Sequence, residues 1–270
     1  APAASAHAPG GKVAFPVPAR FVAAHALNVA QVVARVVPYD YEWAGRPLLP
    51  VVAALLMDCG MLSVPGALLG KTEALTPEDR RVLEAHPKLG ADLLVWRFPN
   101  IAAPLASAVA AHHERADGTG YPSALPGAQV PPLARLLRVA DVYTALLEER
   151  PHRQAADPRA ALTDVLLMAE HGQLDRDFAE YLLNLAYYPV NTVVELTDGR
   201  VGVVVANHPN RLDPRSPGRP VVAVLASADG VPLPRPEHLD LSQADRGGIV
   251  KAVPPARRRE LLGARYPELV

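Results

Sequence analysis

Six side chains in the first 141 residues of this 270-residue chain have the types that bind transition metals. Mixed histidine and aspartate donors favour Fe, Mn or Zn, whereas Ca and Mg favour sites built from oxygen alone. Several of these residues interrupt apolar stretches, where a charged side chain is costly unless it is paired or binds a metal. One such residue is usually a satisfied polar group of the core, but six together favour a metal site. The candidates are His25, Asp58, His86, His112, His113 and Asp141.

The adjacent pair His112-His113 restricts the local structure, because neighbouring side chains on a helix diverge by about 100°. Both rings can face one ion only where the helix ends, and Asp117-Gly118-Thr119-Gly120 predicts such an ending. The other candidates lie on, or at the ends of, separate apolar segments. A helical bundle would bring them together by pointing one or two side chains from each helix inward.

Apolar periodicity predicts helices through most of the first 187 residues. Pro38 ends the first of them, and Thr76-Pro77-Glu78-Asp79 has the N-cap residue, first-turn proline and acids typical of a helix start. That helix is expected to lead to His86-Pro87, with a new helix from Lys88. The predicted helical ranges are 20–37, 48–57, 76–86, 88–97, 102–113, 131–149, 158–170 and 175–187.

Near Pro189 the pattern changes to short β-type segments. VVEL and VGVVV flank Asp198-Gly199, and VVAVLA is followed by Ala228-Asp229-Gly230 and VPL, so two hairpins are expected. The predicted fold class is mainly α, with a helical bundle followed by a small β-barrel-like module. We expect a linker or tail at 1–16, the helical domain at 17–188, the β module at 189–253 and a C-terminal helix or tail at 254–270.

The composition limits the classes of partner. A net charge of −1 gives no global field that would attract a nucleic-acid polymer or an acidic membrane surface. Cys59 is the single cysteine, which excludes an internal disulfide framework and favours a reducing compartment, the cytoplasm. No uninterrupted apolar run reaches the ~18 residues that cross a bilayer, so no membrane segment is expected.

Three segments resemble the HD-GYP family, a branch of the HD phosphohydrolase superfamily. HHERADGTGYP (112–122) resembles the family signature, and HPKLGADLL (86–94) resembles its His-Pro-x-x-Gly segment. RVADVYTALLEERPHR (138–153) resembles its Ala-Asp-Val helix followed by Arg-Pro. The resemblance extends over about 20–187 and implies an HD-type bundle, while the β module resembles a tail of some members.

The resemblance also implies an activity and a set of ligands. Family members hydrolyse cyclic di-GMP to pGpG or GMP at two or three metal ions, commonly iron or manganese. Asp58 would be the catalytic residue that bridges two metals. The implied partners on one metal are His86, His112 and His113, and those on the other are His25 and Asp141.

Substrate contacts are implied at two further places. The loop facing the substrate would contain Gly118, Gly120, Tyr121 and Pro122. Arg150 and Arg153 match basic positions that contact the nucleotide or its phosphate, and guanidinium groups suit phosphate because they bind it by two parallel hydrogen bonds.

The sequence departs from the family where the chemistry would occur. The family reads His-Asp-x-Gly-Lys, but this chain has Met57-Asp58-Cys59-Gly60-Met61, which is a degenerate HD motif. A thioether is a poor replacement for imidazole on Fe(II) or Mn(II), and Met61 has no charge. Phe21 stands where trinuclear members have a glutamate. We therefore expect one or two divalent transition-metal ions, Fe or Mn first and Zn as the alternative.

Three interpretations of the function stay open, and the chain is not assigned as an enzyme on sequence alone. In the first, an impaired phosphodiesterase domain binds metal and acts as a cyclic di-GMP sensor or docking module. In the second, the chain is an active metal-dependent cyclic di-GMP phosphodiesterase with a non-standard site. In the third, the loop contacts a diguanylate cyclase domain and binds no nucleotide. The expected partners are cyclic di-GMP, a diguanylate cyclase domain and a second copy in a homodimer.

Overall fold

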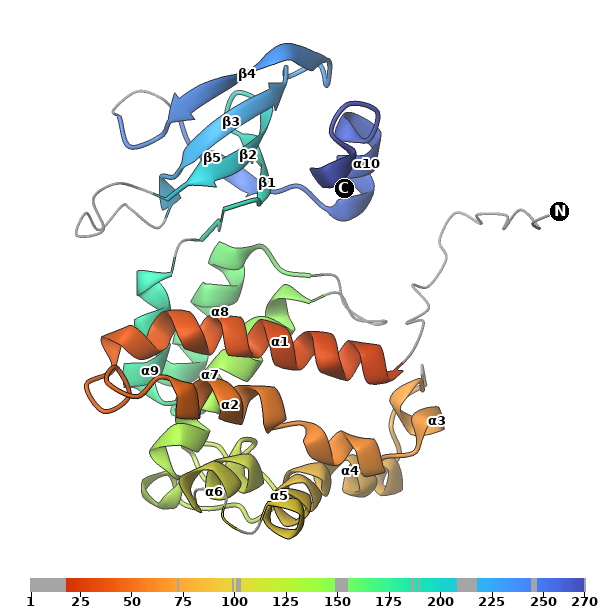
Figure 1. Cartoon of the computed structure of the whole chain (residues 1–270), viewed down its shortest axis with the longest axis vertical. Coiled ribbons are helices and arrows are strands. Elements are labelled where there is room, and N and C mark those ends of the chain that lie inside the picture. The colour runs from red at the N-terminus through yellow and green to blue at the C-terminus, as the bar shows by residue number, and fades with distance from the viewer. Residues whose placement is uncertain are drawn as a thin grey trace, which may run out of the picture. The chain divides into compact units, whose positions relative to one another are not determined.

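A computed structural model describes most of the chain, in two compact units (Figure 1). One unit combines the described residues up to Ala156 with Thr163–Ala179, and the other combines Asp157–Leu162 with those from Glu180 onward. The first is helical and the second contains the sheet, so the predicted fold class is confirmed. The described residues are 18–71, 73–98, 100, 103–148, 155–185, 187–188, 190–207, 218–243 and 247–269.

Nine α-helices precede the sheet in the described part of the chain. They are α1 (Pro18–Val36), α2 (Leu48–Leu56), α3 (Gly66–Leu69), α4 (Pro77–Glu84), α5 (His86–Arg97), α6 (Ala103–Ala111), α7 (Pro132–Leu147), α8 (Pro158–Glu170) and α9 (Arg176–Tyr181). Short 3-10 segments lie between them at Val37–Tyr39, Cys59–Ser63, Gly127–Gln129 and Leu182–Asn184.

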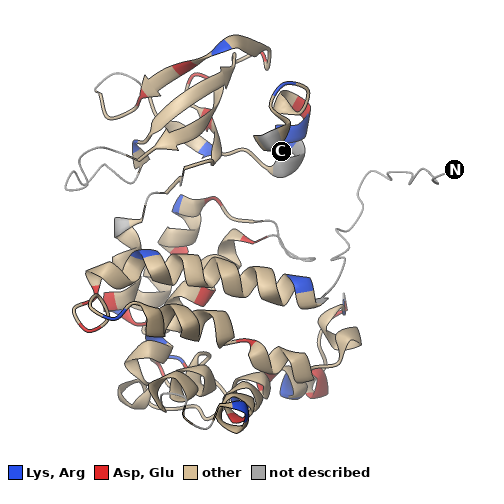
Figure 2. Cartoon of the chain, in the orientation of Figure 1, with Lys and Arg blue, Asp and Glu red and all other residues tan. Residues whose placement is uncertain are grey.

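The helices pack so that distant parts of the chain meet. α1 packs against α2 and α7, while α5 packs against α6 and the 3-10 segment Cys59–Ser63 (Figure 1). The core-facing residues Val29 and Val33 of α1 are completely buried. Lys and Arg are interspersed with Asp and Glu over the described helices and strands (Figure 2). The packed centre of the helical unit is mostly apolar, so each polar side chain that is buried there needs a partner or a function.

Several helix boundaries differ from the prediction. α4 ends at Glu84, and His86 already belongs to α5, because proline is tolerated in the first turn of a helix and Pro87 lies there. α6 ends at Ala111, just before the histidine pair. α9 ends at Tyr181 and continues only as a 3-10 segment. The start at Thr76 is confirmed, since its side chain accepts a hydrogen bond from the Asp79 amide in a capping box.

One described helix, Ala19–Tyr39, is long and apolar enough to cross a membrane by length and composition alone. The core helix of a globular protein passes the same test, and α1 packs against α2 and α7. Polar residues such as His25 and Asn28 interrupt the apolar residues of this helix.

The sheet has five antiparallel strands in the order β4-β3-β2-β1-β5. Both predicted hairpins are confirmed, with Gly199 and Gly230 at positive φ in their turns. β4 is longer than predicted, carries Pro232, Pro234 and Pro236, and is an outer strand of the order; β5 was not predicted. The bounds are β1 (Val193–Leu196), β2 (Val201–Ala206), β3 (Val221–Ala226), β4 (Pro232–Asp240) and β5 (Ile249–Ala252).

Alternate residues of these strands pack into two clusters. Val194 and Val204 belong to one cluster, and Val193 and Val203 belong to the other. Leu262 of the C-terminal helix α10 (Pro255–Leu262) is completely buried in the second cluster, so α10 completes that core. The β-type unit thus has a core of its own.

Candidate metal centre

Asp58 is held at the end of α2 by a close contact between backbones. Gly60, two residues after Asp58, lies so near α5 that a Cβ atom there would be 2.0 Å from the carbonyl oxygen of His86. Only glycine fits at such a distance, and its absence of a side chain lets the turn press against the start of α5. Asp58 is therefore buried, with 8% of its surface exposed, directly beside His86.

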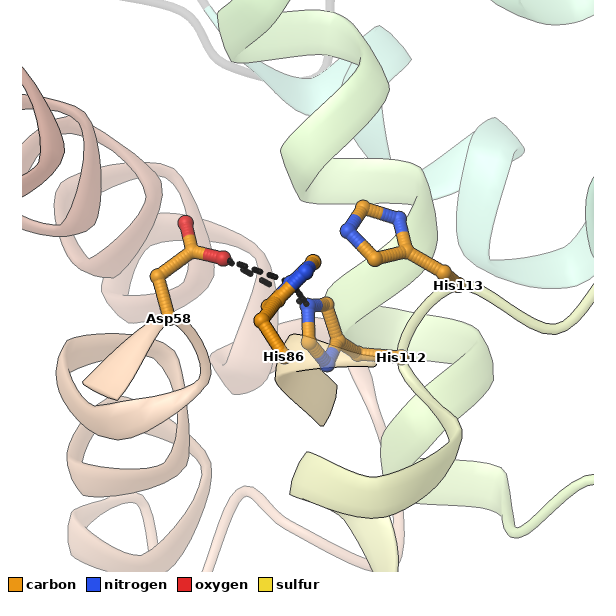
Figure 3. Close-up of side chains that lie close together, drawn as sticks. All are labelled: Asp58, His86, His112 and His113. Carbon is orange, nitrogen blue, oxygen red and sulfur yellow. Dashed lines mark hydrogen bonds and ion pairs between the residues drawn. The ribbon is translucent and has the colours of Figure 1, made fainter. Parts of the chain in front are cut away.

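Three donor groups converge at this point (Figure 3). Asp58 Oδ1 lies 3.2 Å from His86 Nε2 and 3.6 Å from His112 Nε2, and the two Nε2 atoms are 3.3 Å apart. With one atom of His113, the ligand atoms of the group all lie within 4.8 Å of one another. His112 and His113 follow the last residue of α6, so the helix end that their shared orientation requires is present.

The hydrogen bonds of two rings fix which nitrogen faces the centre. His86 Nδ1 lies 2.6 Å from the carbonyl oxygen of Leu83, and His112 Nδ1 lies 2.7 Å from that of Val109. A carbonyl only accepts, so each Nδ1 carries a proton and donates it. Metal-binding histidines commonly have this arrangement, which leaves Nε2 to the ion. Two such nitrogens and a carboxylate oxygen converge in a buried space, and this donor set fits a transition-metal cation.

The charge of Asp58 is stabilised by its neighbours. Burial alone would raise the pKa of this carboxyl, but its close contacts with the His112 and His86 rings outweigh burial and lower it. Cys59 behaves differently: burial and the adjacent Asp58 raise the pKa of its thiol, whose Sγ lies 3.6 Å from the Gly90 carbonyl oxygen. The acid is therefore ionised and available as a ligand, while the thiol is neutral.

His25 and Asp141 lie together, but they bind each other. His25 Nε2 is 2.9 Å from Asp141 Oδ1, and its Nδ1 is 2.7 Å from Glu148 Oε2. Burial disfavours the charged ring, yet the hydrogen bonds to Asp141 and Glu148 outweigh it and raise the pKa of His25 to about 10. Both ring nitrogens of the resulting imidazolium are donors, so the ring has no lone pair for a metal. In this arrangement both ring nitrogens of His25 face carboxylates, one from Asp141 and one from Glu148.

Arg138 links this pair to the histidines, and the sequence pattern had not marked it. Its Nη1 lies 3.1 Å from Asp141 Oδ2 and 3.1 Å from His113 Nδ1. His113 Nδ1 is in turn 3.7 Å from Asp141 Oδ2. Arg138 and Asp141 are three residues apart on α7, and this spacing is the sequence signal that could have revealed Arg138. Glu148 follows directly after the end of the same helix.

The loop after His113 is shaped by its own residues. A Cβ atom at Gly120 would lie 2.4 Å from the Arg115 amide nitrogen, and Gly118 has a φ of +75°, so glycine is required at both. Glu114, 2% exposed, accepts hydrogen bonds from the amides of Ser123 and Leu125. The sequence pattern had not marked Glu114, because its partners are backbone groups nine and eleven residues away.

Tyr121 connects the loop to the centre. Its ring stacks on His113 at 4.6 Å between centroids and 28° between planes. Tyr121 and Pro122 also line an open pocket of about 490 Å³, together with Arg81, Glu84 and Lys88. Arg150 and Arg153, the other predicted substrate contacts, lie outside the described residues.

The residues that depart from the family motif have structural roles. Met57 is completely buried, so its thioether fills the core beside Asp58. Met61 is half-buried in the 3-10 segment. The ring of Phe21 stacks on His25 at 6.3 Å between centroids and supplies no donor.

Comparisons with known proteins agree with this architecture. A family model described as "HD domain" matches residues 21–178, and one described as "KOW domain associated with HD domain" matches residues 193–261. The chain is 35% identical over 208 residues to the cyclic di-GMP phosphodiesterase PA4108 of Pseudomonas aeruginosa, which is 76% of this chain and 48% of that protein.

It is also 40% identical over 126 residues to the cyclic di-GMP phosphodiesterase response regulator RpfG of Xanthomonas campestris, which is 46% of this chain and 32% of that protein. A solved structure, the HDG"Y"P protein Bd1817 from Bdellovibrio bacteriovorus, is 23% identical with a TM-score of 0.48, over 60% of this chain and 51% of that one. The chain spans about half the length, or less, of these curated relatives.

The HD domain model covers more than half of the chain, and the helical bundle brings its His/Asp group together at one buried point. The relatives are named as cyclic di-GMP phosphodiesterases, the activity of the family whose signature HHERADGTGYP resembles. The chain belongs to the HD domain family, in its HD-GYP branch.

Proposed function

We propose that this chain is the HD-GYP domain of a bacterial cyclic di-GMP signalling protein, which binds a divalent transition metal and has impaired phosphodiesterase activity. The observation that carries the proposal is Met57: its side chain is completely buried, directly before Asp58, where the family motif has a histidine. A buried thioether supplies neither a hard ligand nor a proton acceptor to the reaction. The domain then acts as a sensor or docking module in the cytoplasm.

The metal would be held by Asp58, His86 and His112, with His113 beside them, and Fe or Mn suits these donors best. Such an ion polarises a phosphoryl oxygen and makes hydroxide available near neutral pH. Asp58 would be the catalytic residue, because its ionised carboxylate fixes the charge and position of the centre. His86 and His112 orient their Nε2 atoms through their bonds to backbone carbonyls.

The ligand would bind beside this centre. The pocket of about 490 Å³ is of a size typical for a nucleotide-sized ligand. Arg81 and Lys88, which lie there beside the acids Glu84 and Asp92, can each contact a phosphate, and Tyr121 and Pro122 provide an apolar surface. Gly118 and Gly120 would shape the loop for this purpose, and Arg150 and Arg153 would complete the phosphate contacts.

The proposal is tested by separating binding from turnover. Calorimetry should detect cyclic di-GMP binding to the metal-loaded chain, while anaerobic assays with Fe(II) or Mn(II) should detect little pGpG or GMP. The double variant Met57→His with Met61→Lys should raise hydrolysis by roughly 10²-fold, the size of a single electrostatic contact in catalysis. Met168→Lys, the third methionine, is the matched control and should leave turnover unchanged. No gain in the double variant would count against impairment at these positions.

A second candidate function is an active phosphodiesterase with a non-standard site. The convergence of Asp58, His86 and His112, whose facing atoms lie 3.2 to 3.6 Å apart, favours it, because one metal site keeps its ligands. Robust hydrolysis of cyclic di-GMP by the unmodified chain, abolished by Asp58→Ala, would establish this second function in place of the first.

A further inference from the structure

We propose that Arg138 occupies the place of a second metal ion and so limits the centre to one ion. The inference rests on the proposed function, in that a first ion binds at Asp58, His86 and His112. It concerns the neighbouring Asp141, which the family resemblance gives to a second ion, together with His113, whose Nδ1 lies 3.7 Å from Asp141 Oδ2 and could be shared between the two ions.

The position of the guanidinium is the first argument. Arg138 Nη1 lies 3.1 Å from both Asp141 Oδ2 and His113 Nδ1, and these two acceptors are themselves 3.7 Å apart. One cationic nitrogen thus contacts the carboxylate oxygen and the imidazole nitrogen that a metal would bind. The arginine side chain is 18% exposed, so the charge lies mostly within the protein.

The donor geometry is the second argument. Guanidinium has donors only, so His113 Nδ1 accepts the hydrogen bond and its lone pair points at Arg138. Asp141 Oδ1 is meanwhile bonded to His25 Nε2 at 2.9 Å. The positively charged side chains of His25 and Arg138 therefore occupy both oxygens of Asp141, and Arg138 also occupies Nδ1 of His113. Unlike a bound ion, these side chains cannot dissociate from the protein.

The third argument is how the arginine is held. Its Nε is buried and has no hydrogen-bond partner within the described part of the chain. A buried donor left unpaired is costly. The contacts of Nη1 with Asp141 and His113 offset this cost and hold the side chain in place. The guanidinium also keeps its charge at any ordinary pH. A divalent ion arriving here would have to displace a fixed cation.

Metal stoichiometry tests the inference without reference to turnover. The whole chain is loaded anaerobically with Mn(II), desalted and assayed by elemental analysis and electron paramagnetic resonance. We expect about one ion per chain in the wild type, with the spectrum of isolated Mn(II). Arg138→Ala removes the cation and leaves room for an ion with water, so it should bind about two ions and show exchange coupling between them.

Two control variants separate charge from packing. Arg138→Lys retains a cation and should stay near one ion per chain. Arg135→Gln removes a guanidinium from the same helix, one turn away, where it pairs with Asp175 instead of the centre. It should also stay near one ion, and circular dichroism verifies that each variant is folded.

The outcomes distinguish the two proposals. Two coupled ions in the wild type would overturn this inference and leave the proposed metal-binding function intact. Folded Arg138→Ala that still holds one ion would also overturn it. No bound ion in the wild type would overturn the metal centre and this inference together. Because the wild-type spectrum alone can refute the idea, it remains testable even if Arg138→Ala does not fold.

Discussion

His25 is a residue whose pKa the fold raises strongly, to a value that a titration of stability against pH can reach. Its pKa is about 10 in the folded chain, against 6.5 for an ordinary histidine, because Asp141 and Glu148 bind the charged ring strongly enough to overcome its burial. A raised pKa means that the folded state holds the proton more tightly than the unfolded state does. The stabilisation is complete below about pH 6.5 and disappears as the pH rises through about 10.

We therefore predict that the free energy of unfolding of the metal-free wild type falls between pH 6.5 and 10 more steeply than that of His25→Gln. One additional proton bound by the folded state corresponds to a slope of about 1.4 kcal/mol per pH unit. Urea denaturation at a series of pH values measures both curves, and the difference between them removes the titration of other groups. Parallel curves would mean that His25 is not charged in the folded protein.

At the scale of elements, the centre depends on how closely the turn after α2 approaches α5. Gly60 and Gly90 meet there: a Cβ atom at Gly60 would lie 2.6 Å from the Gly90 amide nitrogen and nearer still to the His86 carbonyl oxygen. Any side chain at Gly60 must push the two backbones apart. The distance between Asp58 and His86 would then increase.

We predict that Gly60→Ala lowers the affinity for Mn(II) by at least about tenfold, the loss typical when the groups that position a metal ligand are disturbed. It should also lower the midpoint of thermal unfolding. The matched control is Gly45→Ala, since a Cβ atom at Gly45 has no neighbour within 4 Å. Calorimetric titration measures the affinity. Equal affinities in the two variants would show that the approach of the two elements does not position Asp58.

The sequence predicted elements better than it predicted pairings between them. Apolar periodicity located most helices and both hairpins, because it depends on residues three or four, or two, apart. The residue types beyond the histidine pair predicted that a helix ends there, although α6 ends at Ala111, two residues before the predicted end. The bond between His25 and Glu148 spans 123 residues, and no local pattern reports such a contact. Arg138 was overlooked because an arginine on a helix is usually a solvated residue, and only the fold shows its buried partners.

At the scale of the whole molecule, the sheet-containing unit has a core of its own, and the group of candidate ligands found among the described residues lies in the helical unit. A ligand that binds only the folded state stabilises it by about 2.7 kcal/mol when its concentration is 100 times the dissociation constant. That stabilisation should belong to the unit that binds the ion.

We therefore predict that Mn(II) slows amide hydrogen exchange in α2, α5 and the end of α6, while exchange in β1–β5 stays unchanged. Mass spectrometry of peptides from the same sample compares the two units directly. Asp58→Ala serves as the control and should lose the protection. Equal protection of the strands would contradict the separation of the units that the contacts imply.

The outer strand β4 has a consequence for how the molecule behaves in a crowded solution. Pro232, Pro234 and Pro236 occupy alternate positions, and the amide groups of alternate residues point to the same side of a strand. Proline has no amide hydrogen, so three donors are missing from one side of this half of β4. A foreign strand cannot complete a regular ladder there. This stretch thus resists the edge-to-edge association that leads from a native sheet to aggregates and fibres.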